Sequence, residues 1–307
     1  MAFDVPLKEL LWRGVFGLAL TVSLWSCSDG RSTVSHGATL AESEEVLIEG
    51  QAISQVDGLD NEAILDAIAP SQVIYLAETH SDRADHLAQL SIIQALNAQG
   101  DIAIGLEMFQ RPFQAALDGY LSGELTEADL IAASEYETRW GYDWEFYAPI
   151  LRYAKDNSIP LVALNTPAEI TRKVAKTGLE SLENDDLKFI PPVAEIDLSD
   201  ADYQQWLANV FNAHGGAGHS LNFNNFFAAQ VLWDETMAER VVQQLAAEPE
   251  RQVIVLVGEG HVLNDYGIPN RVARRLPDVV QSSVQLVPAA QEVDPDAIDF
   301  VWRTDGE

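Results

Sequence analysis

The sequence predicts an α/β protein with a mainly parallel sheet flanked by helices and with a smaller helical lid subdomain. Four short runs rich in β-branched and aliphatic residues alternate with helical patterns along the chain. No clean hairpin signal joins any two runs, and such alternation is typical of parallel sheets covered on both faces. With 307 residues and 47% hydrophobic content, the chain can bury a full core.

The first half of the chain contains two strand–helix units. The first unit is a strand at 73–77 followed by a helix at 84–98, in which aliphatic residues recur at helical spacing before a glycine. The second unit is a strand at 102–106 followed by helices at 111–121 and 127–133. Together they predict two crossover connections of one sheet.

The second half of the chain supplies two further strands. A third apolar strand is predicted at 160–164, with a helix at 168–175 after it. A long amphipathic helix at 226–247 precedes the fourth buried strand at 253–257. We expect a basic turn at 271–276.

We expect one folded α/β domain at 47–290. Helical or lid segments at 110–155 and 178–225 belong to it, and 178–225 is polar and interrupted by proline and glycine pairs. The apolar run at 284–287 predicts an added edge strand. The stretch at 291–307 is predicted to be an acidic, loosely patterned C-terminal tail.

The N-terminus predicts export and a lipid anchor. Two cations, Lys8 and Arg13, precede an apolar run at 14–25 that is too short to span a bilayer comfortably, which indicates a signal peptide at 1–26. The run ends in Leu-Trp-Ser-Cys, which resembles a lipobox, so the single cysteine, Cys27, is the predicted lipidation site. A polar, flexible tether follows at 27–46. The alternative is an uncleaved signal anchor, and both readings place the domain on a membrane, facing the periplasm or the cell exterior.

The net charge excludes one class of partner. The chain carries 48 acidic and 18 basic residues, a formal net charge of -30. A surface this negative repels nucleic-acid phosphates and anionic headgroups, so no nucleic acid is expected to bind.

Polar residues follow every predicted strand at the edge where parallel sheets bind ligands. The predicted crevice residues are Glu78, His80, His86, Glu107, Asn165 and His261. Each alone is most simply a cap or turn residue, but their convergence favours a shared crevice. The residue types leave three ligands open: a metal, haem or a small organic molecule. Glu78, His80 and His261 would suit a divalent transition metal such as zinc, manganese or iron.

An aromatic segment at 140–149 carries five aromatic side chains in ten residues. One interpretation is a packed joint between a helix and a strand, and the other is a flat apolar wall with phenolic oxygens, suited to a porphyrin. The sequence contains no Walker lysine, no Gly-x-Ser-x-Gly elbow and no His-Glu-x-x-His helix, and the glycines at 258–260 do not complete a dinucleotide fingerprint.

Several segments, taken together, resemble the ChaN-like haem-binding lipoproteins of the wider haem-uptake and Tiki group. The segments lie at 75–80, 105–109, 144–150, 163–167, 229–238 and 258–261 with 267–269. The resemblance covers roughly 47–290 and implies haem binding, a tendency to pair around haem and a role in iron uptake. It also implies kinship with metal-dependent Tiki proteases and erythromycin-esterase-like enzymes.

Two hypotheses follow from the resemblance. In the first, the chain is an anchored haem carrier. Candidate haem ligands are Tyr142, Tyr147, Tyr203, His214 and His219. Candidate partners for the haem propionates are Arg139, Arg152 and Arg271. In the second, a metal-dependent hydrolase holds an ion with Glu78, His80 and His261, while Glu107 or His86 moves protons.

Overall fold

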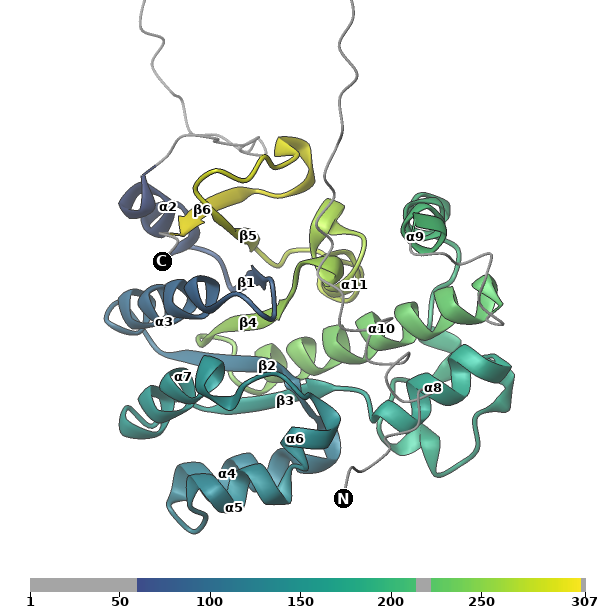
Figure 1. Cartoon of the computed structure of the whole chain (residues 1–307), viewed down its shortest axis with the longest axis horizontal. Helices are drawn as coiled ribbons and strands as arrows, with labels where there is room; N and C mark the ends of the chain where they lie inside the picture. Colours follow the sequence, from purple (N-terminus) through teal and green to yellow (C-terminus); the bar gives the residue numbers. More distant parts are fainter. Residues whose placement is uncertain (1–59, 214–221, 305–307) are drawn as a thin grey trace, which may run out of the picture.

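A parallel β-sheet of six strands forms the centre of the molecule (Figure 1). The computed structural model describes residues 60–213 and 222–304. Within them the strands lie in the order β3-β2-β4-β1-β5-β6, and every neighbouring pair is parallel. In chain order they are β1 (Val73–Glu78), β2 (Ile102–Gln110), β3 (Leu161–Asn165), β4 (Gln252–Gly258), β5 (Gln281–Pro288) and β6 (Phe300–Thr304). The predicted α/β class is confirmed.

Helices connect most of these strands, because parallel neighbours need long crossovers. The α-helices of the described residues are α2 (Asn61–Ile68), α3 (Arg83–Asn97), α4 (Gln114–Ser122), α5 (Glu127–Ala133), α6 (Tyr136–Arg139), α7 (Trp144–Asp156), α8 (Ala168–Thr177), α9 (Ala201–Ala213), α10 (Phe223–Ala247) and α11 (Ile268–Arg275). Short polar side chains start several of them. Asp82 caps α3 and Asp143 caps α7, each by accepting a backbone N–H two residues on.

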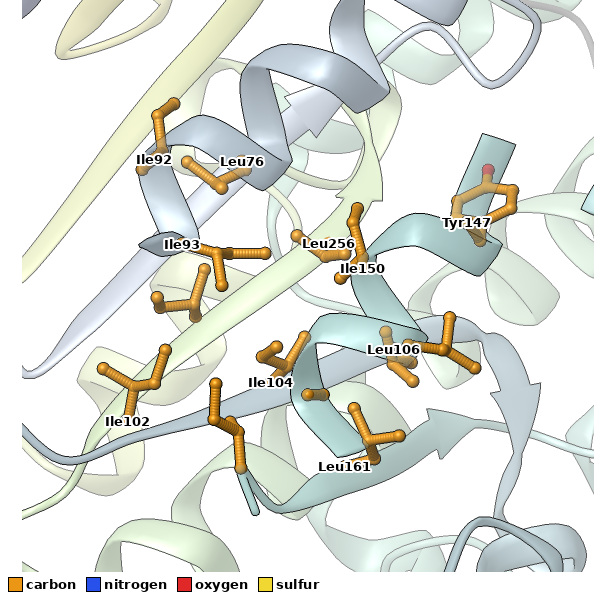
Figure 2. Close-up of a cluster of buried hydrophobic side chains, with 14 of the residues drawn as sticks. Leu76, Ile92, Ile93, Ile102, Ile104, Leu106, Tyr147, Ile150, Leu161 and Leu256 are labelled. Carbon is orange, nitrogen blue, oxygen red and sulfur yellow. The ribbon is translucent and has the colours of Figure 1, made fainter. Parts of the chain in front are cut away.

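The sheet has an apolar layer on each face, because successive strand residues point to opposite sides. On one face Leu76 of β1 and Leu256 of β4 pack in one cluster with Ile92 of α3 and Ile150 of α7 (Figure 2). On the other face Val255 and its neighbours pack with α10 and α11. The central strands are buried on both sides, which explains why their apolar runs are continuous rather than alternating.

A third apolar cluster lies beside the sheet, between α8, α9 and the first half of α10 (Figure 1). Phe226 and Phe227 of α10 belong to it with Ile170 of α8 and Leu207 of α9. Much of this cluster comes from the segment in which helical lid structure was expected. The other expected helical segment, at 110–155, forms α4 to α7 and packs on the sheet.

Three segments differ from the expectation. The residues at 271–276 belong largely to α11, which starts with a proline in its first turn, a position where proline favours a helix. β5 lies between β1 and β6 and is therefore not an edge strand. β6 lies inside the stretch expected to be an acidic tail. Its apolar residues, Phe-Val-Trp, directly follow the acidic residues at 292–299. The acidic composition of the whole stretch therefore led to the prediction of a tail rather than of this short strand.

The N-terminal predictions lie outside the described residues. The signal peptide at 1–26, the lipidated Cys27 and the tether at 27–46 stay predictions. Among the residues that the structure describes, none of the helices combines the length and the apolarity needed to cross a membrane.

Candidate functional site

The carboxyl ends of three neighbouring strands bring predicted polar residues together. β1, β4 and β2 are adjacent, and Glu78 at the end of β1 lies opposite Gly258 at the end of β4. Glu107 of β2 accepts a hydrogen bond from the Gly258 backbone N–H at 2.7 Å. His261 ends the 3-10 turn Glu259–His261 that follows β4. Ligands of open parallel sheets bind at this edge, so these residues define the candidate site.

Glu78 is a buried carboxylate held by four side chains. One oxygen accepts a hydrogen bond from the Tyr147 hydroxyl at 2.5 Å and lies 2.8 Å from His80 Nδ1. The other accepts one from Gln89 Nε2 at 2.6 Å, with His86 Nδ1 at 3.6 Å. Burial alone would raise the pKa of Glu78, but these hydrogen bonds and the two histidines outweigh it and lower the pKa to about 2. Glu78 is therefore ionised at neutral pH.

His80 brings the site to the surface. Its side chain is 12% exposed, whereas that of Glu78 is fully buried. Trp140 meets the imidazole edge-on with ring centroids 4.7 Å apart, and Tyr142 lies at 5.1 Å. Burial lowers the pKa of His80, but the carboxylates of Glu107 and Glu78 raise it above its ordinary value. We call His80, Trp140 and Tyr142 the site mouth.

Gly258 leaves room for the imidazole of His80. A Cβ at this position would lie 2.7 Å from His80 Cε1 and 2.8 Å from Nε2, closer than van der Waals contact allows. The backbone φ of Gly258 is -63°, which alanine adopts freely. Gly258→Ala is therefore expected to displace His80 while costing only about 1–3 kcal/mol of stability. An NMR titration of the His80 ring should show its pKa moving down, because the ring leaves its carboxylates; unchanged His80 resonances would contradict this.

His261 is the centre of a second buried chain of hydrogen bonds. Its Nδ1 lies 2.5 Å from Asp234 and 3.2 Å from Gln230 Nε2, and its Nε2 lies 3.5 Å from Glu107. Asp234 also accepts a hydrogen bond from the Tyr203 hydroxyl at 2.7 Å. Burial lowers the pKa of His261, but the two carboxylates overcome it and raise the pKa to about 10. His261 is therefore an imidazolium between two anions at neutral pH.

This raised pKa gives folding stability a dependence on pH. The pKa of His261 is about 10 in the folded protein, against roughly 6.5 when unfolded. Its contribution is therefore complete below about pH 6.5 and is lost as the pH rises towards 10, with a slope of up to ~1.4 kcal/mol per pH unit. We expect urea unfolding to show this loss in the unaltered protein and a flatter profile in His261→Gln. Parallel profiles in the two proteins would contradict the assignment.

His86 and Asn165 complete the crevice. His86 stacks on Phe146 with ring centroids 5.1 Å apart, and its Nε2 lies 3.2 Å from the backbone oxygen of His80. Asn165, at the end of β3, donates to the backbone oxygen of Glu107 at 2.7 Å. Its own Oδ1 is buried and has no hydrogen-bond partner within the described chain. The structure thus brings all six predicted crevice residues to one edge of the sheet, in two groups: Glu78 with His80 and His86, and Glu107 with His261 and Asn165.

The candidate iron ligands differ in accessibility. Tyr147 and Tyr203 are fully buried, and their hydroxyls donate to the buried carboxylates described above. Tyr142 is half-buried at the site mouth, where burial and the nearby carboxylates raise its pKa to about 12. His214 and His219 lie outside the described residues. Of the three tyrosines, Tyr142 is therefore the one that a large planar ligand can reach.

The three candidate propionate partners are all engaged by the protein. Arg271 is buried, and its guanidinium donates to backbone carbonyls at the start of α11. Arg152 lies on the exposed side of α7 in ion pairs with two surface glutamates. Arg139, next to Trp140 in the chain, lies 3.0 Å from Glu169 and donates to Gln110 at 2.8 Å. Arg139 is the cation nearest in sequence to the site mouth.

The alternative metal trio is not gathered round one point. Glu78 and His80 contact each other, whereas His261 contacts Asp234 and Glu107 instead. Across residues 60–213 and 222–304, no group of three or more His, Cys, Asp or Glu side chains is arranged to hold a metal ion. The predicted trio therefore does not fit a divalent metal in this geometry.

Helices supply site residues that the strand ends did not predict. Gln89 of α3 holds Glu78, and Asp234 of α10 holds His261. Asp85 of α3 accepts the Thr79 backbone N–H at 2.8 Å, and burial raises its pKa to about 8. The available signal was spacing: Asp85 and Gln89 lie four residues apart, as do Gln230 and Asp234, so each pair shares one helix face with buried apolar residues.

The site residues lie within a segment that matches a known protein family. The family model described as haem-binding uptake, Tiki superfamily, ChaN matches residues 64–272. The chain belongs to this family. The ChaN-family match contains every residue of the two hydrogen-bonded groups described above. The solved ChaN of Campylobacter jejuni with cofacial haem has a TM-score of 0.60 and 17% identity to this chain, covering 81% of this chain and 93% of the other, which shows a shared fold.

Two other proteins are similar over most of this ChaN-family chain. The chloroplastic protein RETICULATA-RELATED 5 of Arabidopsis thaliana is 26% identical over 275 residues, which are 80% of this chain and 36% of that protein. The chain thus spans little more than a third of that relative's length. An erythromycin esterase in its open conformation has a TM-score of 0.46 and 15% identity, covering 73% of this chain and 72% of the other.

Proposed function

We propose that this ChaN-family chain is an exported, membrane-anchored haem carrier that serves iron uptake. Tyr142 carries the proposal, because it is a half-buried phenol at the site mouth beside Trp140 and His80. Tyrosine oxygen is an established ligand of haem iron, and aromatic rings pack well against a flat porphyrin. The Campylobacter jejuni ChaN binds haem cofacially, which supports haem as the cargo.

The charges behind the site mouth decide how haem would sit. Glu78 and Glu107 are buried and their pKa values are lowered below the ordinary value, so the inner wall holds two carboxylates, of which Glu107 faces the imidazolium of His261. Like charges repel most strongly where water is excluded, so the haem propionates would point outward. On the outer side, the side chain of Arg139, which is 20% exposed and next to Trp140 in the chain, would pair with a propionate. The ferric iron, which is positive, would face the carboxylates.

Pairing of two copies around haem is part of the proposal. A phenolate at the site mouth approaches one face of a flat ligand and leaves the opposite face for a second molecule. Light scattering after size exclusion should therefore show dimers that form on addition of haemin. A mass that stays monomeric at saturating haemin would reject the pairing while leaving haem binding itself intact.

The membrane anchor is proposed to be a lipid on Cys27. Mass spectrometry of the protein isolated from membranes should find Cys27 as the acylated N-terminal residue. Cys27→Ser should leave the protein uncleaved or unlipidated, and an unlipidated chain that still fractionates with the membrane would favour the uncleaved signal anchor.

Haemin titration of the full chain tests the carrier. Iron can bind the Tyr142 oxygen only after its proton leaves, and the pKa of Tyr142 is raised to about 12. We therefore expect a saturable Soret change with phenolate-to-iron charge-transfer absorption, and an affinity that rises by up to about tenfold per pH unit. Absence of a saturable spectral change would reject the carrier.

A second candidate, hydrolysis, is favoured by the pairing of His80 with Glu78 at the site mouth. Glu78 holds His80 Nδ1 at 2.8 Å, so Nε2 is available to take a proton from water, the arrangement of a general base oriented by a carboxylate. Turnover of p-nitrophenyl acetate or of a fluorogenic peptide would support it. Glu78→Gln should then abolish turnover yet leave haemin affinity largely unchanged, which separates the two functions.

A further inference from the structure

A cavity of about 350 Å³ lies between α10 and the segment that follows α8, and it shares no lining residue with the site above. Its charged lining residues are Arg111, Lys188, Glu239 and Arg240, and we call this cavity the basic pocket. Phe189 and Ile190 form an apolar wall beside them. A volume in this range is typical of small-molecule sites.

The charge of the basic pocket is opposite to that of the protein. Three cations and one anion line it, and Asp185 next to the lining pairs with Lys188 at 2.7 Å, which leaves one excess positive charge in a chain whose formal net charge is -30. The guanidinium groups of Arg111 and Arg240 repel each other, and this repulsion is relieved when an anion binds between them. A positive cavity is therefore a selective place for an anion on this molecule.

Arg111 is fixed at one wall of the basic pocket. Its Nη1 donates to Glu239 at 2.7 Å, and its Nη2 donates to the Thr236 backbone oxygen. Its Nε is buried and finds no acceptor among the residues described. Burial, together with the positive charges of Arg240 and Arg275, lowers the pKa of Arg111 against the pull of Glu239. One glutamate therefore does not neutralise this group of guanidinium side chains.

Arg240 is the cation whose charge is left unpaired. Within residues 60–213 and 222–304 its side chain meets no carboxylate. Its two hydrogen bonds are long and go to neutral amide oxygens, at 3.3 Å to Gln243 and 3.4 Å to Gln114. Hydrogen bonds of this length are weak, so an oxyanion would displace little in reaching the guanidinium fork. Lys188 is 65% exposed and stands at the rim beside Asp185.

We propose that the basic pocket binds a small organic oxyanion, a phosphate ester or a carboxylate, through the guanidinium of Arg240. Arginine forks match the paired oxygens of both groups. Lys188, which pairs with Asp185 at 2.7 Å, adds an N–H donor at the rim, and the wall of Phe189 and Ile190 takes the organic part. This site is separate from the haem carrier function and stands whether or not haem binds.

Isothermal titration of the full chain with phenyl phosphate and with benzoate, at constant ionic strength, tests the proposal. We expect one saturable site, with Arg240→Gln weakening binding by about tenfold or more, the range of a lost hydrogen bond to a charged group. Lys188→Gln, at the exposed rim, should fold normally and weaken binding by a smaller factor. Binding of phenyl phosphate alone would assign the phosphate class, and binding of benzoate alone the carboxylate class.

Arg172→Gln is the matched control, because it removes one positive charge from the exposed side of α8 without touching the cavity. It should bind both probes as the unaltered protein does. The proposal would be overturned if neither probe gave saturable heat, or if Arg240→Gln bound the probes as tightly as Arg172→Gln does.

Discussion

Replacing Tyr142 by phenylalanine is expected to weaken haemin binding by about 100-fold or more and to remove the phenolate-to-iron charge-transfer absorption. Phenylalanine keeps the ring that contacts Trp140 and His80 but lacks the oxygen proposed to bind iron. The ring is only half-buried, so the free energy of unfolding should change by less than about 1 kcal/mol. Haemin titration and urea unfolding of the same sample measure the two effects.

Tyr153→Phe is the matched control for this experiment. Tyr153 lies on the same stretch of chain, in α7, and its hydroxyl accepts a hydrogen bond from Asn97 outside the site. It should bind haemin as the unaltered protein does. If Tyr142→Phe keeps both affinity and absorption, the iron is held by another group, and His214 and His219 become the next variants to make.

Replacing Glu235 by glutamine is expected to lower the free energy of unfolding by about 3–5 kcal/mol, the usual effect of removing one partner of a buried ion pair. Glu235 is fully buried in α10 and accepts hydrogen bonds from Arg274 at 2.7 and 2.8 Å. Arg275 lies 2.7 Å away and Arg271 3.5 Å away, and the backbone N–H of Asp197 also donates to it. Three cations of α11 would thus lose their common anion.

Urea unfolding gives the measurement, with Glu137→Gln as the control. Glu137 is exposed on α6, so its loss should change stability by less than about 0.5 kcal/mol. A Glu235→Gln protein within about 1 kcal/mol of the unaltered one would show that the three arginines find water or other acceptors.

The sequence predicted those parts of the fold that one local pattern determines. β1, β3 and β4 are buried on both faces, so their apolar runs are short and continuous, and the polar residues directly after them mark the site. The helix expected at 127–133 is α5, and the structure shows that a local capping box between Thr126 and Asp129 starts it.

The remainder depends on contacts between distant segments. Asp234 lies in the middle of α10, and its sequence neighbours do not reveal that His261 and Tyr203 both contact it. Tyr142 is half-buried and Tyr147 is fully buried, although only five positions separate them. This difference in exposure depends on how α7 packs on the sheet. The basic pocket brings together Arg111 and Arg240, which lie 129 positions apart in the chain, and no local sequence pattern predicts such a pair.

The position of β4 determines when the site can exist. β1 and β2 are consecutive strands of the chain, but β4 lies between them in the sheet, with Val253 opposite Val73 on one side and Ala103 on the other. Until residues 252–258 have emerged and inserted, the two halves of the sheet have no shared hydrogen bonds and Glu107 has no Gly258 to bind. Such long-range pairing forms late and slowly. A chain that has been synthesised only as far as β3 therefore cannot form this edge, and a ligand can bind there only after β4 has been made and inserted.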